Sequence, residues 1–148
     1  MTAELGPGGA GRELQELLQF FYQCPVGLIE IDDRGEVRKI NPAAARMLAP
    51  ALVGEDLQQV FGLFARLCPG LVESITARPE TRGPLGAPVR MAVPGRGGSV
   101  DWREVSAVRV EQSRVMITIV DVSAERRLAQ REHELAVRLQ RSMLGRLV

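Results

Sequence analysis

The sequence predicts an α+β domain built on an antiparallel sheet of five strands. Three observations indicate this fold. A β-hairpin pattern covers residues 26–40, and a set of short helical patterns follows it. Three further strand patterns joined by tight turns occupy residues 89–120. Amphipathic helical patterns precede the first strand and follow the last one, so we expect a helix on each side of the domain.

Length and composition place the chain among soluble proteins with one domain. It has 148 residues, of which 45% are hydrophobic, and its formal net charge is +1. Mixed charges give no concentrated basic face, so we expect neither a nucleic acid nor a membrane as partner. The sequence has no secretion signal and no long apolar run, and arginine greatly outnumbers lysine. We therefore predict a cytoplasmic bacterial protein.

The N-terminal part is expected to be a mobile leader followed by a helix. Residues 1–11 are rich in glycine and have no apolar periodicity, which is typical of a mobile segment. Residues 12–23 place apolar side chains at helical spacing, and Pro25 ends the pattern. The apolar stripe predicts that this helix packs on a second subunit through Leu14, Leu17, Leu18 and Phe21.

The middle of the chain alternates between tight turns and short helices. Residues 26–32 and 36–40 form the predicted hairpin around Gly35. Asn41 before Pro42 is a helix-start signal, since asparagine caps helices and proline suits their first position. We expect helices over residues 43–48 and 55–60, two helical pieces within 61–77, and an exposed loop over 78–88.

The last strands should form a meander over residues 89–93, 100–110 and 114–120. The second of them alternates between two sides, one with Trp102 and the other with Arg103, and neither side is purely apolar. Which side faces the core therefore stays open. Residues 124–148 continue as a helix whose apolar stripe includes Leu128, Leu135 and Leu139. A parallel coiled coil with a second copy would bury that stripe.

Several motifs in this order resemble the PAS family of sensory domains. The hairpin and helix GLIEIDDRGEVRKINPAAARML is similar to the family's opening, and GGSVDWREVSAV resembles its glycine turn and tryptophan-bearing strand. The segment ITIVDVSAERR is similar to the family's closing Asp-x-Thr/Ser signature. The resemblance implies a PAS fold with short helices on one face of the sheet. It assigns residues 12–123 to the PAS domain with its flanking helix and residues 124–148 to a signalling helix.

The resemblance implies a sensory function, with Asp121 and Ser123 relaying a signal into the last helix. PAS domains commonly hold a small ligand between the sheet and the helices, and Trp102 is the candidate residue for such a pocket. The sequence names no cofactor. An empty core with a dimerisation role is expected, non-covalent flavin stays open as an alternative, and haem is not expected because His133 lies outside the core.

The chain offers few groups for catalysis, so we expect no catalytic site in it. The only histidine, His133, sits on the charged last helix, and Cys24 and Cys68 are too few to complete a zinc site, so no metal is expected. The alternative is a small stand-alone enzyme that uses the carboxylates of Asp32 and Asp33. A solvated hairpin is the competing explanation for those carboxylates.

The end of the chain suggests an effector. The segment AVRLQRSMLGRLV resembles the linker that precedes the catalytic domain of PPM-type serine/threonine phosphatases of the sporulation stage II class, with Gly145 where their pattern has proline. This resemblance implies that the chain is the sensory part of a longer phosphatase. A histidine kinase or a diguanylate cyclase as effector, or a stand-alone regulator, are the alternatives.

Overall fold

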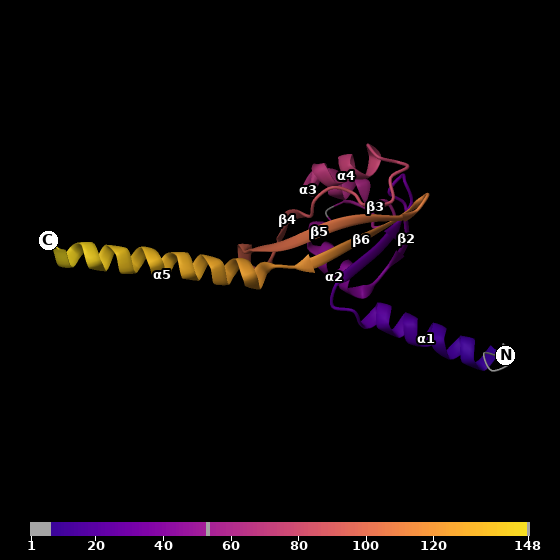
Figure 1. The fold of residues 1–148 in the computed structure, drawn as a ribbon, viewed down its shortest axis with the longest axis horizontal. Coiled ribbons are helices and arrows are strands. Elements are labelled where there is room, and N and C mark those ends of the chain that lie inside the picture. The colour runs from indigo at the N-terminus through magenta and orange to yellow at the C-terminus, as the bar shows by residue number, and fades with distance from the viewer. Residues whose placement is uncertain (1–6, 53, 148) are drawn as a thin grey trace.

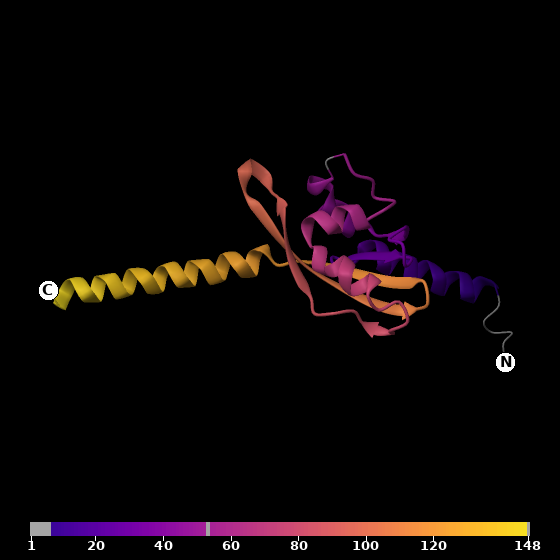
Figure 2. The ribbon, with the colours of Figure 1, turned by 90° about the horizontal axis from the view of Figure 1, so that it is seen from above.

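The structure of the protein is a computed structural model that describes residues 7–52 and 54–147. A sheet with short helices on one face forms the central domain (Figure 1). The helix α1 (Pro7–Gln23) and the long helix α5 (Ser123–Leu147) leave this domain toward opposite ends of the molecule, as the views in Figures 1 and 2 both show. The predicted α+β class with two flanking helices is confirmed.

The sheet is antiparallel and has the predicted hairpin and meander. The strands β1 (Gly27–Ile31), β2 (Val37–Ile40), β5 (Val100–Glu111) and β6 (Arg114–Asp121) follow the order β2-β1-β6-β5. The short β3 (Gly83–Pro84) and β4 (Val89–Pro94) pair with different stretches of β5. The sheet therefore has five lateral positions, and two strands share the last one.

The turn between β1 and β2 requires a glycine at position 35 and an aspartate at position 32. Gly35 has φ of +85°, where a Cβ would lie 2.4 Å from the side chains of Gln59 and Phe61. Glycine tolerates this conformation, and it has no Cβ to collide. Asp32 closes the turn because its Oδ1 accepts the N–H groups of Arg34 and Glu36, at 2.9 and 3.0 Å.

Three α-helices cover one face of the sheet: α2 (Pro42–Leu48), α3 (Phe61–Leu67) and α4 (Pro69–Thr76). Single turns of 3₁₀ helix occur at Ala49–Ala51 and Arg96–Gly98. The two helical pieces predicted within residues 61–77 are α3 and α4, and the break between them falls before Pro69, which cannot continue a helix. Between the helices and the sheet lies one continuous aliphatic core, which includes Ile29, Leu48, Phe64, Leu71, Ile75, Met91, Val105 and Ile117.

The alternation along β5 settles which side faces the core. Arg103, Val105, Ala107 and Arg109 are buried, and the residues between them are half-buried or exposed. Successive side chains of a strand point to opposite faces, so the face that carries Trp102 is the outer one. The three α-helices lie on the other face, and Val108, Val110 and Val120 on the outer face stay exposed.

Two segments differ in part from the sequence prediction: the start of the chain and residues 78–88. α1 is already helical at Pro7, the first described residue, so residues 7–11 of the predicted leader belong to the helix. The rest of the predicted leader, residues 1–6, lies outside the described residues. Residues 78–88 are not simply an exposed loop, since they contain β3 and Leu85, which is buried and donates its N–H to Ala107 O at 2.9 Å.

The helix predicted over residues 55–60 is wrong. This segment instead runs beside the hairpin, where Gln58 O accepts the N–H of Val37 at 2.8 Å and Val60 donates to Gly35 O at 3.0 Å. Glu36 and Gln59 also pair in an isolated antiparallel bridge. Hydrogen bonds to the hairpin therefore replace the local hydrogen bonds of a helix. The pattern of six residues alone does not show such distant partners.

Candidate functional site

The start of α5 is bound to the sheet through Asp121 and Ser123, the two predicted relay residues. Asp121 Oδ1 accepts the N–H of Ser123 at 2.9 Å, which satisfies a free donor in the first turn of the helix. Ser123 Oγ accepts the N–H of Trp102 at 2.8 Å and lies 3.3 Å from its carbonyl oxygen. Together these contacts join the last strand, its neighbour β5 and the exit helix.

A buried arginine completes this exit junction. Arg103 Nη1 lies 2.9 Å from Asp121 Oδ1, and Nη2 lies 3.6 Å from Asp101 Oδ2. The Arg103 side chain is only 8% exposed and that of Asp121 is 53% exposed, so the ion pair joins a buried cation to a carboxylate at the surface. Sequence reasoning missed Arg103, although its place on the side of β5 opposite Trp102 was the available signal.

The end of α1 is bound through Asn41, whose side chain is 1% exposed. Its Oδ1 accepts the N–H groups of Leu28 and Ala44, at 2.8 and 3.0 Å. Its Nδ2 donates to the carbonyl oxygens of Phe21 and Val26, at 3.2 and 2.9 Å. One amide therefore caps α2, as predicted, and also holds the end of α1 and the start of β1, which the sequence did not reveal.

Trp102 does not line the space between the sheet and the helices. It is half-buried on the outer face of β5, across the strand pair from Ala92. The interior behind it is filled by the aliphatic core, in which Val105, Ile117 and Ile119 are fully buried. The structure thus does not bring Trp102 to the place where a PAS ligand pocket was expected.

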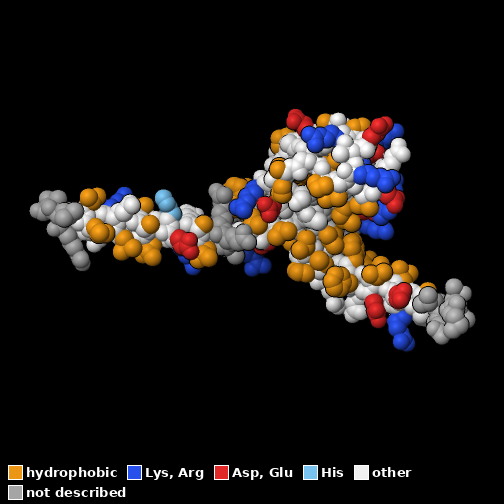
Figure 3. Space-filling view, in the orientation of Figure 1, with side chains coloured by type: hydrophobic (Ala, Val, Ile, Leu, Met, Phe, Trp, Pro, Cys, Tyr) orange, Lys and Arg blue, Asp and Glu red, His pale blue; other side chains and the backbone are white. Residues whose placement is uncertain are grey.

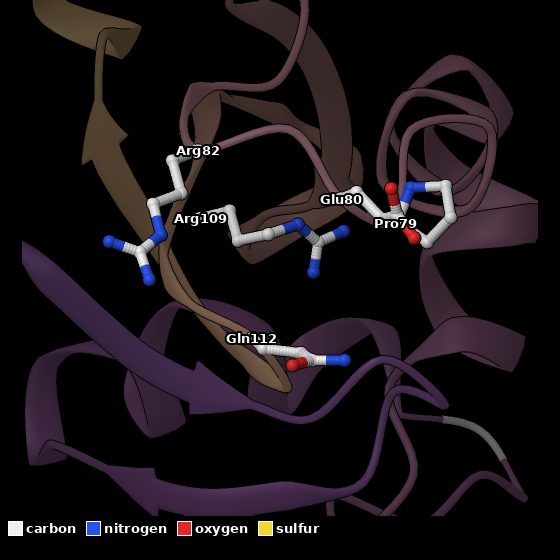
Figure 4. Close-up of a pocket in the computed structure, with 5 residues that line it drawn as sticks. All are labelled: Pro79, Glu80, Arg82, Arg109 and Gln112. Atoms are coloured by element: carbon white, nitrogen blue, oxygen red, sulfur yellow. The ribbon is translucent and has the colours of Figure 1, made fainter.

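A polar pocket of about 190 Å³ opens at the other end of β5 (Figure 4). Pro79, Glu80, Arg82, Arg109 and Gln112 line it. The Arg109 side chain is 1% exposed, pairs with Asp33 of the hairpin turn, and donates from Nη2 to Ile75 O at 3.0 Å. Asp33 also accepts the hydroxyl of Ser113 at 3.1 Å. Arg109 therefore joins the sheet, α4 and the hairpin turn, a structural role that accounts for its burial.

The carboxylates proposed for the alternative enzyme are engaged in structural contacts. Asp32 closes the hairpin turn, and Asp33 neutralises Arg109. Glu30 accepts two hydrogen bonds from Arg114, at 3.0 and 2.8 Å, and these bonds raise the pKa of the Arg114 guanidinium. A surface hollow of about 360 Å³ lies beside Asp32 and Asp33, so space is present there, although both carboxylates already have partners.

The apolar residues predicted for a dimer interface are uncovered. Leu14, Leu17 and Leu18 are 58%, 68% and 46% exposed, and Phe21 beside them is half-buried. Leu128, Leu135 and Leu139 on α5 are exposed by 57% or more. Figure 3 shows hydrophobic side chains along both helices. Exposed apolar stripes of this kind are typical of helices that bind a partner.

Other predicted features are placed as follows. His133 lies on α5 and borders a shallow hollow of about 340 Å³ with charged neighbours. Cys24 is half-buried and Cys68 is buried, and both are free thiols. Within residues 7–52 and 54–147, no three metal-binding side chains cluster. Among the helices described, none has both the length and the apolar character that crossing a bilayer requires.

Comparisons with known proteins identify the fold. Residues 15–80 match a family model described as PAS domain. A domain of the sensory box sensor histidine kinase/response regulator from Geobacter sulfurreducens is 18% identical, with a TM-score of 0.52 over 76% of this chain and 96% of that one. The photoactive yellow protein domain of the sensor histidine kinase Ppr from Rhodospirillum centenum is 17% identical, with a TM-score of 0.50 over 69% and 90%.

One similar structure also covers the flanking helices. An RNA-binding light-oxygen-voltage receptor is 16% identical, with a TM-score of 0.58, and the match covers 96% of this chain but 40% of the receptor. This chain therefore spans less than half of that receptor. No curated protein matches the chain. Residues 15–80 thus match the PAS family model, and the chain as a whole has the PAS fold.

Proposed function

We propose that this chain is a sensory and dimerisation module that passes a signal through α5 to an effector. The single observation that carries this proposal is the exit junction of Arg103, Asp121 and Ser123. A rearrangement of the sheet reaches α5 through these contacts, because the same side chains bind both elements. A coupling of about 1 to 3 kcal/mol would be sufficient to bias an attached domain.

The proposal includes a homodimer in which the exposed stripes of α1 and α5 meet their counterparts. Fully burying a leucine side chain contributes about 1.5 to 3 kcal/mol, so Leu128, Leu135 and Leu139 would favour association of two α5 helices. Sensor histidine kinases contain the domains named in two of the similar structures, which supports a signalling role here.

The proposed effector is a PPM-type phosphatase, and its support is the resemblance of the segment that begins at Ala136 to the linker of those enzymes. A histidine kinase or a diguanylate cyclase is the alternative effector. The filled core favours a signal that acts at the dimer interface or through a partner protein, since apolar side chains pack the interior between the sheet and the short helices. The chain itself is proposed to have no catalytic activity and to function in the cytoplasm of a bacterium.

The test is to replace Asp121 with alanine in the protein that carries the effector. We expect faster amide hydrogen exchange in the first turns of α5 and an effector activity that no longer responds to the signal. Asp101→Ala is the matched control, because Asp101 also lies near Arg103, at 3.6 Å, but precedes Trp102 on β5 and does not cap α5 as Asp121 does. Regulation that survives in the Asp121→Ala protein, with unchanged exchange in α5, would refute the relay.

A further inference from the structure

An apolar groove of about 530 Å³ runs between α1 and the edge strand β2. One wall is the exposed stripe of α1, and the other is the edge of the sheet. The residues that line it are Leu14, Leu17, Leu18, Phe21, Tyr22, Arg38, Lys39 and Ile40. Because β2 is at the end of the strand order, no other described strand covers this side.

The rim of the groove carries positive charge. Arg38 and Lys39 are exposed, and neither forms an ion pair with another side chain of the described part of the chain. An occupant with acidic groups beside an apolar stripe would complement such a groove.

The chain itself has a segment with this chemistry. Glu13 and Glu16 on α1 are exposed and, like the two cations, form no ion pair within residues 7–52 and 54–147. With Leu17 and Phe20 they line a neighbouring hollow of about 430 Å³ on α1. The acidic pair therefore lies directly beside the apolar stripe, with Leu17 common to both surfaces.

The geometry points to a reciprocal exchange in which α1 of a second copy occupies this groove. Each α1 places its leucines against the stripe of the other and brings Glu13 and Glu16 to the rim formed by Arg38 and Lys39. A twofold axis makes both contacts identical, so each subunit contributes its α1 to the groove of the other and receives the other's α1 in its own groove. This inference rests on the proposed dimer and specifies its N-terminal interface.

Two other surfaces are less suitable partners for α1. A membrane would select a helix with a basic polar face, whereas α1 carries Glu13 and Glu16 against Arg12. The outer face of the sheet offers exposed valines, but its Arg114 is already paired with Glu30, and its exposed Arg90 lies opposite Glu104 in the strand pair. The groove instead joins the apolar stripe to two neighbouring cations that form no ion pair among the described residues.

Charge reversal of the full chain tests the exchange. We expect the dimer dissociation constant, measured by sedimentation at low salt, to rise by about tenfold or more in Arg38→Glu/Lys39→Glu and in Glu13→Lys/Glu16→Lys. Mixing the two variants should restore dimerisation as heterodimers, because each acidic helix then meets a basic rim and each basic helix an acidic rim. Arg78→Glu/Arg96→Glu is the matched control, with the same change of charge at exposed positions elsewhere.

The outcomes separate this inference from the dimer itself. Dimers that persist with unchanged affinity in both variants would overturn the groove contact and leave a dimer held by α5 or by the outer sheet face. A monomeric wild-type chain would overturn both. Weakening without recovery in the mixture would also overturn the exchange, because it would show that the two charge pairs do not meet.

Discussion

Replacing Asn41 with alanine should destabilise the domain far more than the loss of a helix cap would. The substitution removes the four hydrogen bonds of a residue that is 1% exposed. The N–H groups of Leu28 and Ala44 and the carbonyl oxygens of Phe21 and Val26 then lose their side-chain partner. An unsatisfied buried polar group costs about 1 to 3 kcal/mol. Three of the four hydrogen bonds are only partly buried, so we expect water to replace some of them in the variant. We therefore expect a loss of about 3 to 4 kcal/mol.

Urea denaturation of the two proteins measures this loss, which corresponds to a drop in Tm of roughly 10 °C for a domain of this size. Asn41→Ser is the matched variant, since serine keeps the cap on Ala44 but is too short to reach Phe21 and Val26. It should recover only about 1 kcal/mol, the usual contribution of an N-cap. Hydrogen exchange should show the Ala44 amide protected again and the Leu28 amide still exposed. A loss below about 1 kcal/mol in Asn41→Ala would refute the multiple role of Asn41.

Two further predictions concern buried groups. Burial raises the pKa of the Cys68 thiol from about 9 to about 11, so its protonated form is favoured in the folded state. Stability should be full below pH 9 and fall by about 2 to 3 kcal/mol as the pH rises to 11, with a smaller fall in Cys68→Ala, as measured by urea denaturation at each pH. Asp33→Ala should cost about 3 kcal/mol by leaving Arg109 buried and unpaired, whereas Arg109→Met should cost less, because the remaining Asp33 side chain is 35% exposed and water can solvate it. Equal losses in those two variants would contradict the buried-pair account.

Local chemistry explains why much of the fold could be predicted. The hairpin depends on Asp32 and Gly35, whose effects are confined to a few neighbouring residues. The start of α2 depends on Asn41 and Pro42, and the break before α4 on Pro69, which act within one helical turn. Such residues act on their immediate neighbours in the chain, so the adjacent sequence is sufficient to predict their effect. The structure confirms each of these predictions.

Long-range contacts explain what could not be predicted. Arg103 and Arg109 read as surface residues because arginine is rarely buried, yet each pairs with an aspartate contributed by another strand or turn. Asp33 lies 76 positions from Arg109, so neither residue signals the pair locally. Residues 55–60 were misassigned for the same reason, since their hydrogen-bond partners belong to the hairpin. The site therefore depended on the pairing of distant segments, which a single sequence does not display.

The two helix junctions lie on neighbouring strands, and this arrangement gives the relay a physical route. β1 begins at Gly27, beside the carbonyls that Asn41 holds, and Gly27 pairs with Ile119 of β6. A Cβ at Gly27 would lie 3.0 Å from the Cα of Ala44 and 3.1 Å from the Cβ of Ile119, so α2, β1 and β6 pack here without spare room. Close-packed elements transmit a shift instead of absorbing it. Since Asp121 follows Ile119 by two positions, a movement of α1 in the proposed dimer would reach the start of α5 through one strand pair.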